Sequence, residues 1–159
     1  MTASAERRPA RRPAPSVGKE PRHRAREAAV QMLYQWEVGR SSMPDVIQTF
    51  WLHDPPAAGS LPDTHRAFAQ ALATGVAETV GNLDPVIVEA AEHWRLERMH
   101  VMDRLILRLA VYEFLHETAT PSRVIINEAL ELARTFSSED SVRFINGILD
   151  AIRRRLERE

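Results

Sequence analysis

Apolar side chains recur every three to four residues along most of this chain, and no segment shows the period of two that is typical of a strand. Glycine, proline and serine, which favour helix ends, bound the periodic segments; Gly39 and Gly81 are expected to end the first and third of them. The pattern predicts an all-α fold, a compact bundle of about seven helices. The expected helices span residues 22–38, a short segment after Ser42 and Pro44, 63–80, 84–94, 101–116, 122–136, and a last segment from about 139 to 156.

The segment 101–116 is the most apolar, which predicts a helix at the centre of the bundle. Asp103 lies at its entrance and is expected to be exposed, since a buried carboxylate would need partners. In the last segment, Asn146 and Gly147 interrupt the apolar stripe. We expect a close helix approach at Gly147 and a buried Asn146 amide that bonds a neighbouring helix.

The first 21 residues contain four prolines among arginine, alanine and serine, and almost no large apolar side chain. Such a segment buries too little surface to offset the entropy of ordering it, so residues 1–21 are predicted to form a disordered arm before a single domain over 22–159. Residues 1–26 hold eight lysines and arginines against two glutamates, in a chain whose net charge is -1. This asymmetry indicates a polyanionic partner; a solvated tail that aids solubility is the alternative.

The sequence offers little for catalysis. It contains no cysteine, its six histidines show no metal-ligand spacing, and its six glycines form no phosphate-binding motif. We therefore expect no enzyme activity, no metal site and no cofactor. No apolar run reaches the length of a membrane span and no apolar stretch follows the basic start as in a secretory signal, which favours a cytoplasmic location.

The cluster Arg22, His23, Arg24 and Arg26 lies where the basic arm meets the first turns of a helix. Cations oppose the macrodipole at a helix N-terminus, so several of them there indicate a bound anion. A guanidinium grips phosphates and stacks on unpaired bases, which suits RNA. Tyr34, two turns further on, either adds a stacking surface or belongs to the core.

Three segments together resemble one known family. They are RHRAREAAVQMLYQWEV, MDRLILRLAVYEFL and VIINEALELARTFSSEDSVRFINGILDAIRR, and from the first to the last they extend over roughly Arg22 to Arg155. In this order they resemble the NusB family. The resemblance implies a seven-helix protein that binds single-stranded boxA RNA together with NusE, a small-subunit ribosomal protein. With other Nus factors, the pair would join RNA polymerase and let it read through terminators in ribosomal RNA operons.

The resemblance also implies roles for particular residues. His23 stands where the family often has arginine or lysine, so its charge is expected to depend on pH. Phe144 and Ile145 point about 100° apart, which predicts that Ile145 is in the core while the Phe144 ring, at the edge of the stripe, is available to a base. The implied RNA-binding residues are Arg22, Arg24, Arg26, Asp140, Arg143 and Phe144, and the implied NusE contact is Asp103.

Two other classes of protein share some of these features. The same helical module occurs as the RNA-binding domain of a ribosomal RNA cytosine methyltransferase, but that enzyme needs cysteines and a catalytic domain with a Rossmann-like fold. A helix-turn-helix DNA-binding regulator is also small and helical. It would carry its basic residues on a recognition helix, whereas here they gather at the N-terminus.

Overall fold

The computed structural model describes residues 21–53, 61–156 and 158, and these residues form helices and no strand. The expected arm, apart from Pro21, lies outside the described residues. The elements in chain order are α1 (Pro21–Gly39), α2 (Met43–His53), α3 (Asp63–Ala90), a 3-10 turn η1 (Leu96–Arg98), α4 (Val101–His116), α5 (Ser122–Phe136) and α6 (Glu139–Arg155). The all-α prediction is confirmed, with six α-helices in the described part of the chain where about seven were expected.

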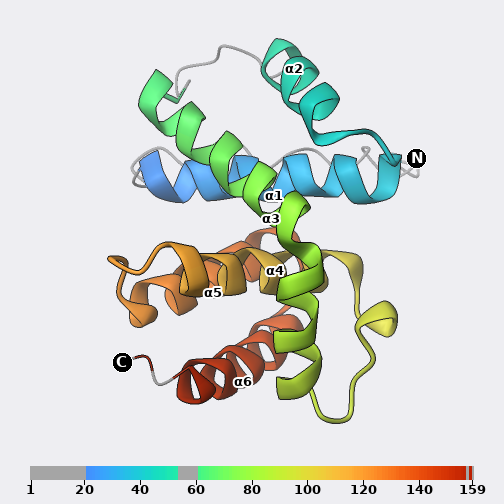
Figure 1. Cartoon of the computed structure of the whole chain (residues 1–159), viewed down its shortest axis with the longest axis vertical. Helices are drawn as coiled ribbons and strands as arrows, with labels where there is room; N and C mark the ends of the chain where they lie inside the picture. Colours follow the sequence, from blue (N-terminus) through green and yellow to red (C-terminus); the bar gives the residue numbers. More distant parts are fainter. Residues whose placement is uncertain (1–20, 54–60, 157, 159) are drawn as a thin grey trace, which may run out of the picture.

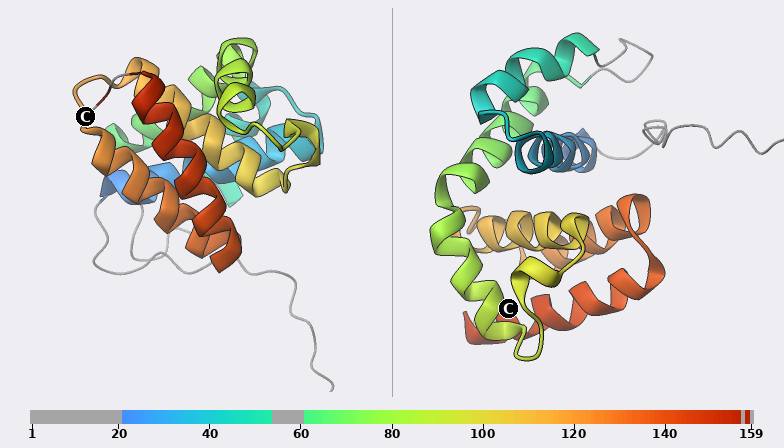
Figure 2. Two further views of the ribbon diagram at one scale, coloured as in Figure 1. Left: turned by 90° about the horizontal axis from the view of Figure 1, so that it is seen from below. Right: turned by 90° about the vertical axis from the view of Figure 1, so that its right-hand side faces the viewer.

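Helix α3 connects two groups of helices. It runs along one side of the molecule from α1 and α2 at one end to α6 at the other (Figures 1 and 2). The sequence predicted two helices here, with a break at Gly81 and a new start at Asp84, but α3 continues through Pro85. Leu83 and Ile87 are fully buried, so the packing of this stretch outweighs the local cost of an interior proline.

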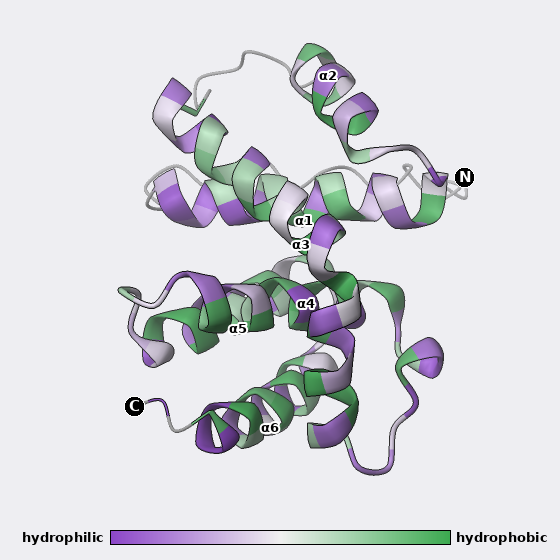
Figure 3. Ribbon diagram, in the orientation of Figure 1, coloured by the Kyte–Doolittle hydropathy of each residue, from purple (hydrophilic) through white to green (hydrophobic). Residues whose placement is uncertain are grey.

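Helix α4 lies at the centre, as predicted, and packs against α1, α3, α5 and α6. Seven consecutive residues, from Leu105 to Val111, are buried. Figure 3 shows hydrophobic residues along most of α4, in contrast to the hydrophilic η1 and the last turn of α6. A helix that is apolar on most sides must be covered on most sides, and this fixes α4 as the core of the bundle.

The close approach between helices occurs at Gly75, where α3 crosses α4. A Cβ atom at Gly75 would lie 2.2 Å from Cζ of Tyr112. The prediction of a close approach at Gly147 is wrong, because a Cβ there would meet nothing within 4 Å and Asn146 beside it is exposed. The polar Asn146–Gly147 pair lies on the solvent face of α6, where a side chain is not required for packing.

Helix α1 ends one residue later than the sequence indicated. Gly39 still belongs to the helix, and the left-handed residue that follows it is Arg40, with a φ of 54°. The left-handed position after a helix normally favours glycine, so a β-carbon is accommodated here at a small local cost.

Candidate nucleic-acid interface

The basic cluster predicted at the start of α1 divides into outward and inward side chains. Arg22 is exposed, and its guanidinium carbon lies 4.4 Å from the ring centroid of Phe68. Arg24 is half-buried. These two arginines remain accessible at the N-terminal end of α1, where RNA contact was predicted.

His23 faces the protein interior and is only 4% exposed. Its Nδ1 contacts the Glu128 carboxylate on α5, and its Nε2 lies 3.0 Å from Oε1 of Glu27. Burial lowers the pKa of the imidazole, but hydrogen bonds and negative charge from Glu128 and Glu27 outweigh it and raise the pKa to about 9. At neutral pH His23 is therefore a protonated imidazolium that links α1 to α5. Because it is buried, its ring is not accessible to RNA.

Arg26 is buried as well, and the expectation that it presents its guanidinium to RNA is wrong. Its Nε donates to both carboxylate oxygens of Glu113 on α4, at 3.0 and 3.1 Å, and its Nη2 donates to Oε1 at 2.8 Å. Both residues are 2% exposed. Burial raises the pKa of Glu113, while the charge and hydrogen bonds of Arg26 oppose that rise. The pair joins α1 to α4.

Tyr34 lies further along α1 and is 39% exposed, so the alternative of a core tyrosine is wrong. Val38, one turn later, is also exposed. The ring of Tyr34 is thus accessible to a partner, as a stacking role requires.

The second group of predicted residues lies at the start of α6. Asp140 and Arg143 are exposed and form an ion pair with an N–O distance of 2.6 Å. Phe144 is half-buried at the edge of the apolar stripe, while Ile145 is fully buried. The structure therefore confirms the predicted orientation of these two neighbours.

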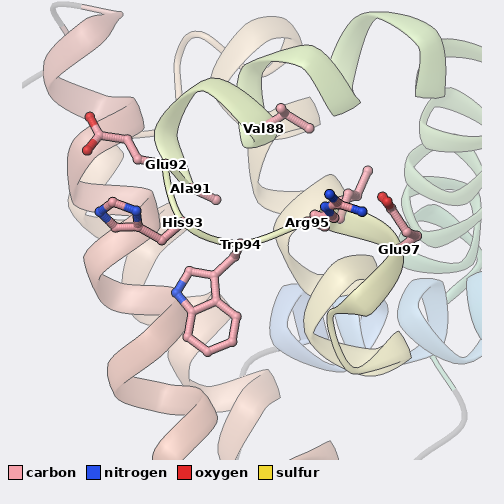
Figure 4. Close-up of a pocket in the computed structure, with 8 residues that line it drawn as sticks. Val88, Ala91, Glu92, His93, Trp94, Arg95 and Glu97 are labelled. Atoms are coloured by element: carbon pink, nitrogen blue, oxygen red, sulfur yellow. The ribbon is translucent and has the colours of Figure 1, made fainter.

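Sequence reasoning missed Trp94, which packs against Phe144. The two rings meet edge to face, with centroids 5.2 Å apart and an interplanar angle of 73°. Trp94 was predicted to continue a helix, but it follows α3 in a turn and is 58% exposed. It borders a hollow of about 400 Å³ between the end of α3 and η1, and its indole ring projects from the turn (Figure 4). Its spacing from Ile87 and Ala90 gave no sign of this exposure.

Asp103, the predicted NusE contact, is buried at 6% exposure, so the expectation that it is exposed is wrong. Its Oδ1 accepts a hydrogen bond from Ser137 Oγ and its Oδ2 accepts one from Ser141 Oγ, both at 2.8 Å. Ser138 caps α6 by accepting a hydrogen bond from the Ser141 amide. Asp103 thus fastens the start of α4 to the start of α6.

The two groups of predicted RNA-binding residues lie at opposite ends of α4. The start of α1 is anchored near the C-terminal end of α4 by Arg26 and Glu113, whereas the start of α6 is anchored near its N-terminal end by Ser141 and Asp103. Asp103 and Glu113 are ten residues apart, a rise of about 15 Å along a helix. An RNA strand that touched both groups would have to extend across this distance.

Neither a metal-binding cluster nor a membrane-spanning helix is found among the residues that the structure describes. No group of three or more histidines or carboxylates there could hold a metal ion. None of the helices described is long and apolar enough to cross a membrane.

Six packed α-helices without a strand in the described ranges define a small all-helical protein. Residues 23–154 match the model of the NusB family, and the chain belongs to this family. A transcription antitermination protein NusB from Koribacter versatilis is 44% identical over 138 residues, which cover 87% of this chain and 92% of the relative. The corresponding protein from Sorangium cellulosum is 43% identical over 137 residues, 86% of this chain and 94% of the relative.

Solved structures give the same fold. T. maritima NusB superposes with a TM-score of 0.75 and 34% identity, over 86% of this chain and 92% of that chain. A chain from a crystal structure of the antitermination factors NusB and NusE in complex with dsRNA superposes with a TM-score of 0.74, over 85% of this chain and 97% of that one. Its identity of 20% shows the common fold alone.

Proposed function

We propose that this protein is a transcription antitermination factor that binds single-stranded boxA RNA together with NusE and joins RNA polymerase with other Nus factors. The observation that carries the RNA-binding part is the outward pair Arg22 and Arg24 at the N-terminal end of α1. The names of the relatives with 43% and 44% identity support antitermination, and the known complex of NusB and NusE with dsRNA supports the choice of partners. The family membership favours this function over that of a helix-turn-helix regulator.

The accessible aromatic rings suit a single strand. Tyr34 on α1, Trp94 in the turn after α3 and Phe144 near the start of α6 offer rings on which unpaired bases can stack. In a duplex the bases stack on each other and their faces are not available. We assign the sequence-independent part of the affinity to Arg22 and Arg24, and the preference for unpaired bases to the rings.

The experiment is a titration of the full chain, with and without NusE, against boxA RNA and a scrambled RNA of the same length. We expect NusE to increase the affinity for boxA RNA and to leave the scrambled RNA weakly bound. Equal affinities for the two RNAs in the presence of NusE would overturn the proposal.

A salt series tests the role of the α1 arginines. Each phosphate contact to a single strand contributes about 0.7 to the slope of log K against log salt, so Arg22→Ala with Arg24→Ala should flatten the slope by about 1.4. Arg134→Ala is the matched control, because Arg134 is an exposed arginine on α5 that already pairs with Glu131. An unchanged slope in the double variant would place the phosphate contacts elsewhere.

A further inference from the structure

A shallow hollow lies between α5 and α6, apart from every residue discussed so far for RNA. Its volume is about 260 Å³, and it is lined by Arg123, Ile126, Asn127 and Arg153. Arg123 and Asn127 are one helical turn apart on α5, so their side chains lie on one face, and Arg153 reaches the hollow from α6.

The polar groups of the hollow differ in how they are engaged. Arg153 is held in place, since its Nη2 donates to Asp150 at 2.8 Å and its Nη1 donates to the carbonyl of Arg158 at 3.2 Å. Arg123 and Asn127 are exposed and make no side-chain hydrogen bond or ion pair with another described residue. The hollow therefore combines one fixed guanidinium with two open polar groups.

Both charged residues that line the hollow are arginines. Asp150, the partner of Arg153, pairs with it at 2.8 Å and with Arg154 at 2.7 Å. These two arginines lower the pKa of Asp150, whose hydrogen bond to Arg153 is the main cause. Arg123 and Arg153 thus bring two guanidinium groups to the hollow, and the carboxylate that Arg153 contacts is already paired, which favours an anionic ligand.

The residue types suit one nucleotide of a single strand. A guanidinium can donate two parallel hydrogen bonds to a phosphate, so Arg123 suits the phosphate of the nucleotide. The Asn127 amide both donates and accepts, as recognition of a base edge requires. Ile126 supplies an apolar floor for the base.

The position of the hollow connects it to the start of α1. Glu128, which contacts His23, is adjacent to Asn127 in the sequence and therefore points about 100° away from it around α5. The start of α1 and the hollow thus lie on two sides of α5 at the same height along its axis. A strand bound by Arg22 and Arg24 reaches the hollow by crossing α5.

We propose that this hollow binds one nucleotide of the RNA, with its phosphate on Arg123 and its base edge on Asn127. The inference rests on the proposed function, because it extends the same RNA surface across α5. It adds a contact that discriminates between bases to the electrostatic contacts of α1.

The test measures boxA RNA binding in the presence of NusE for Arg123→Ala, Asn127→Ala and the control Arg134→Ala. We expect Arg123→Ala to lower the affinity about tenfold and to flatten the salt slope by about 0.7. Asn127→Ala should lower the affinity several-fold with the slope unchanged, because an amide binds no counterion. Arg134→Ala removes the same charge from the same helix outside the hollow and should stay within about twofold of the wild type.

The outcomes separate the two proposals. If the wild type binds boxA and scrambled RNA equally, the proposed function itself fails. If the wild type prefers boxA RNA but Arg123→Ala and Asn127→Ala bind like Arg134→Ala, the hollow is not part of the RNA surface and this inference is overturned. All three side chains are exposed or half-exposed, so thermal unfolding of the variants should match the wild type and exclude misfolding as a cause.

Discussion

Neighbouring basic residues at the start of α1 have different roles because their partners differ. Arg22 and Arg24 face outward, whereas Arg26 and His23 meet carboxylates from α4 and α5, which are 87 and 105 residues away in the sequence. The sequence predicted the cluster and its place on a helix. It could not predict which members would be neutralised, because that depends on packing between distant segments.

The Arg26–Glu113 pair should be essential for stability. Arg26→Ala would leave the Glu113 carboxylate buried without a partner, and we expect the free energy of unfolding to fall by about 3–5 kcal/mol. Urea unfolding followed by circular dichroism measures this. Arg24→Ala, two residues away on the same helix and half-buried, should cost less than about 1 kcal/mol. Equal stability of the two variants would show that Arg26 is not a structural residue.

Asp103 is buried where the sequence predicted exposure, so its substitution should lower stability. Asp103→Lys would remove the acceptor of the Ser137 and Ser141 hydroxyls and bury a cation in its place, so stability should fall by at least about 1–3 kcal/mol. The exposed Asp140→Lys serves as the control, with an expected change within about 0.5 kcal/mol. A folded Asp103→Lys protein with wild-type thermal stability would contradict the hydrogen-bonded role.

At the scale of the helices, periodicity was sufficient for most of the fold. The predicted segments 101–116 and 122–136 have the bounds of α4 and α5, because their apolar stripes are long and bounded by helix-ending residues. The predicted break in α3 is wrong because Gly81 and Pro85 indicate a helix end only locally. The helix continues because Leu83 and Ile87, on either side of Pro85, are buried against other helices. A short window of sequence does not show which residues such contacts will bury.

The two helical glycines Gly75 and Gly147 allow a matched test of helix packing. Gly147→Ala adds a methyl group in open space and removes backbone entropy from the unfolded chain, so it should stabilise the protein by about 0.5–1 kcal/mol. Gly75→Ala places its methyl group against the Tyr112 ring and should destabilise by about 1–3 kcal/mol. Thermal unfolding distinguishes the signs. If Gly147→Ala were the more harmful change, Gly75 would not be the point of close contact between α3 and α4.

At the scale of the whole molecule, the sequence could not place surfaces that several segments build together. Phe144 was predicted from its own helix, but its partner Trp94 comes from a turn fifty residues earlier in the chain. The hollow between α5 and α6 likewise needs Arg123 and Arg153 side by side. Such juxtapositions follow from the handedness and crossing of helices, which periodicity alone does not determine.

The stability of the bundle should depend on pH through His23. Its pKa is about 9 in the folded protein and near 6.5 in the unfolded chain, so folding favours the protonated form. The contribution of about 2–4 kcal/mol is fully present below pH 6.5 and is lost as the pH rises through 9. Urea unfolding at pH 6.5 and pH 9.5 should show this loss in the wild type and a much smaller one in His23→Gln. Identical pH dependence in the two proteins would exclude His23 as its source.

The central place of α4 sets how freely different parts of the protein can diverge among relatives. Helices α1, α3, α5 and α6 all pack on α4, so a change of length or direction in any of them disturbs a common core. Helix α2 packs on α1 and α3, at one end of the molecule (Figure 1). Because α2 packs on two helices and α4 is packed by four, a change in the length or direction of α2 disturbs less of the core. Insertions and partner-specific features should therefore accumulate at α2, while the α4 neighbourhood keeps its geometry.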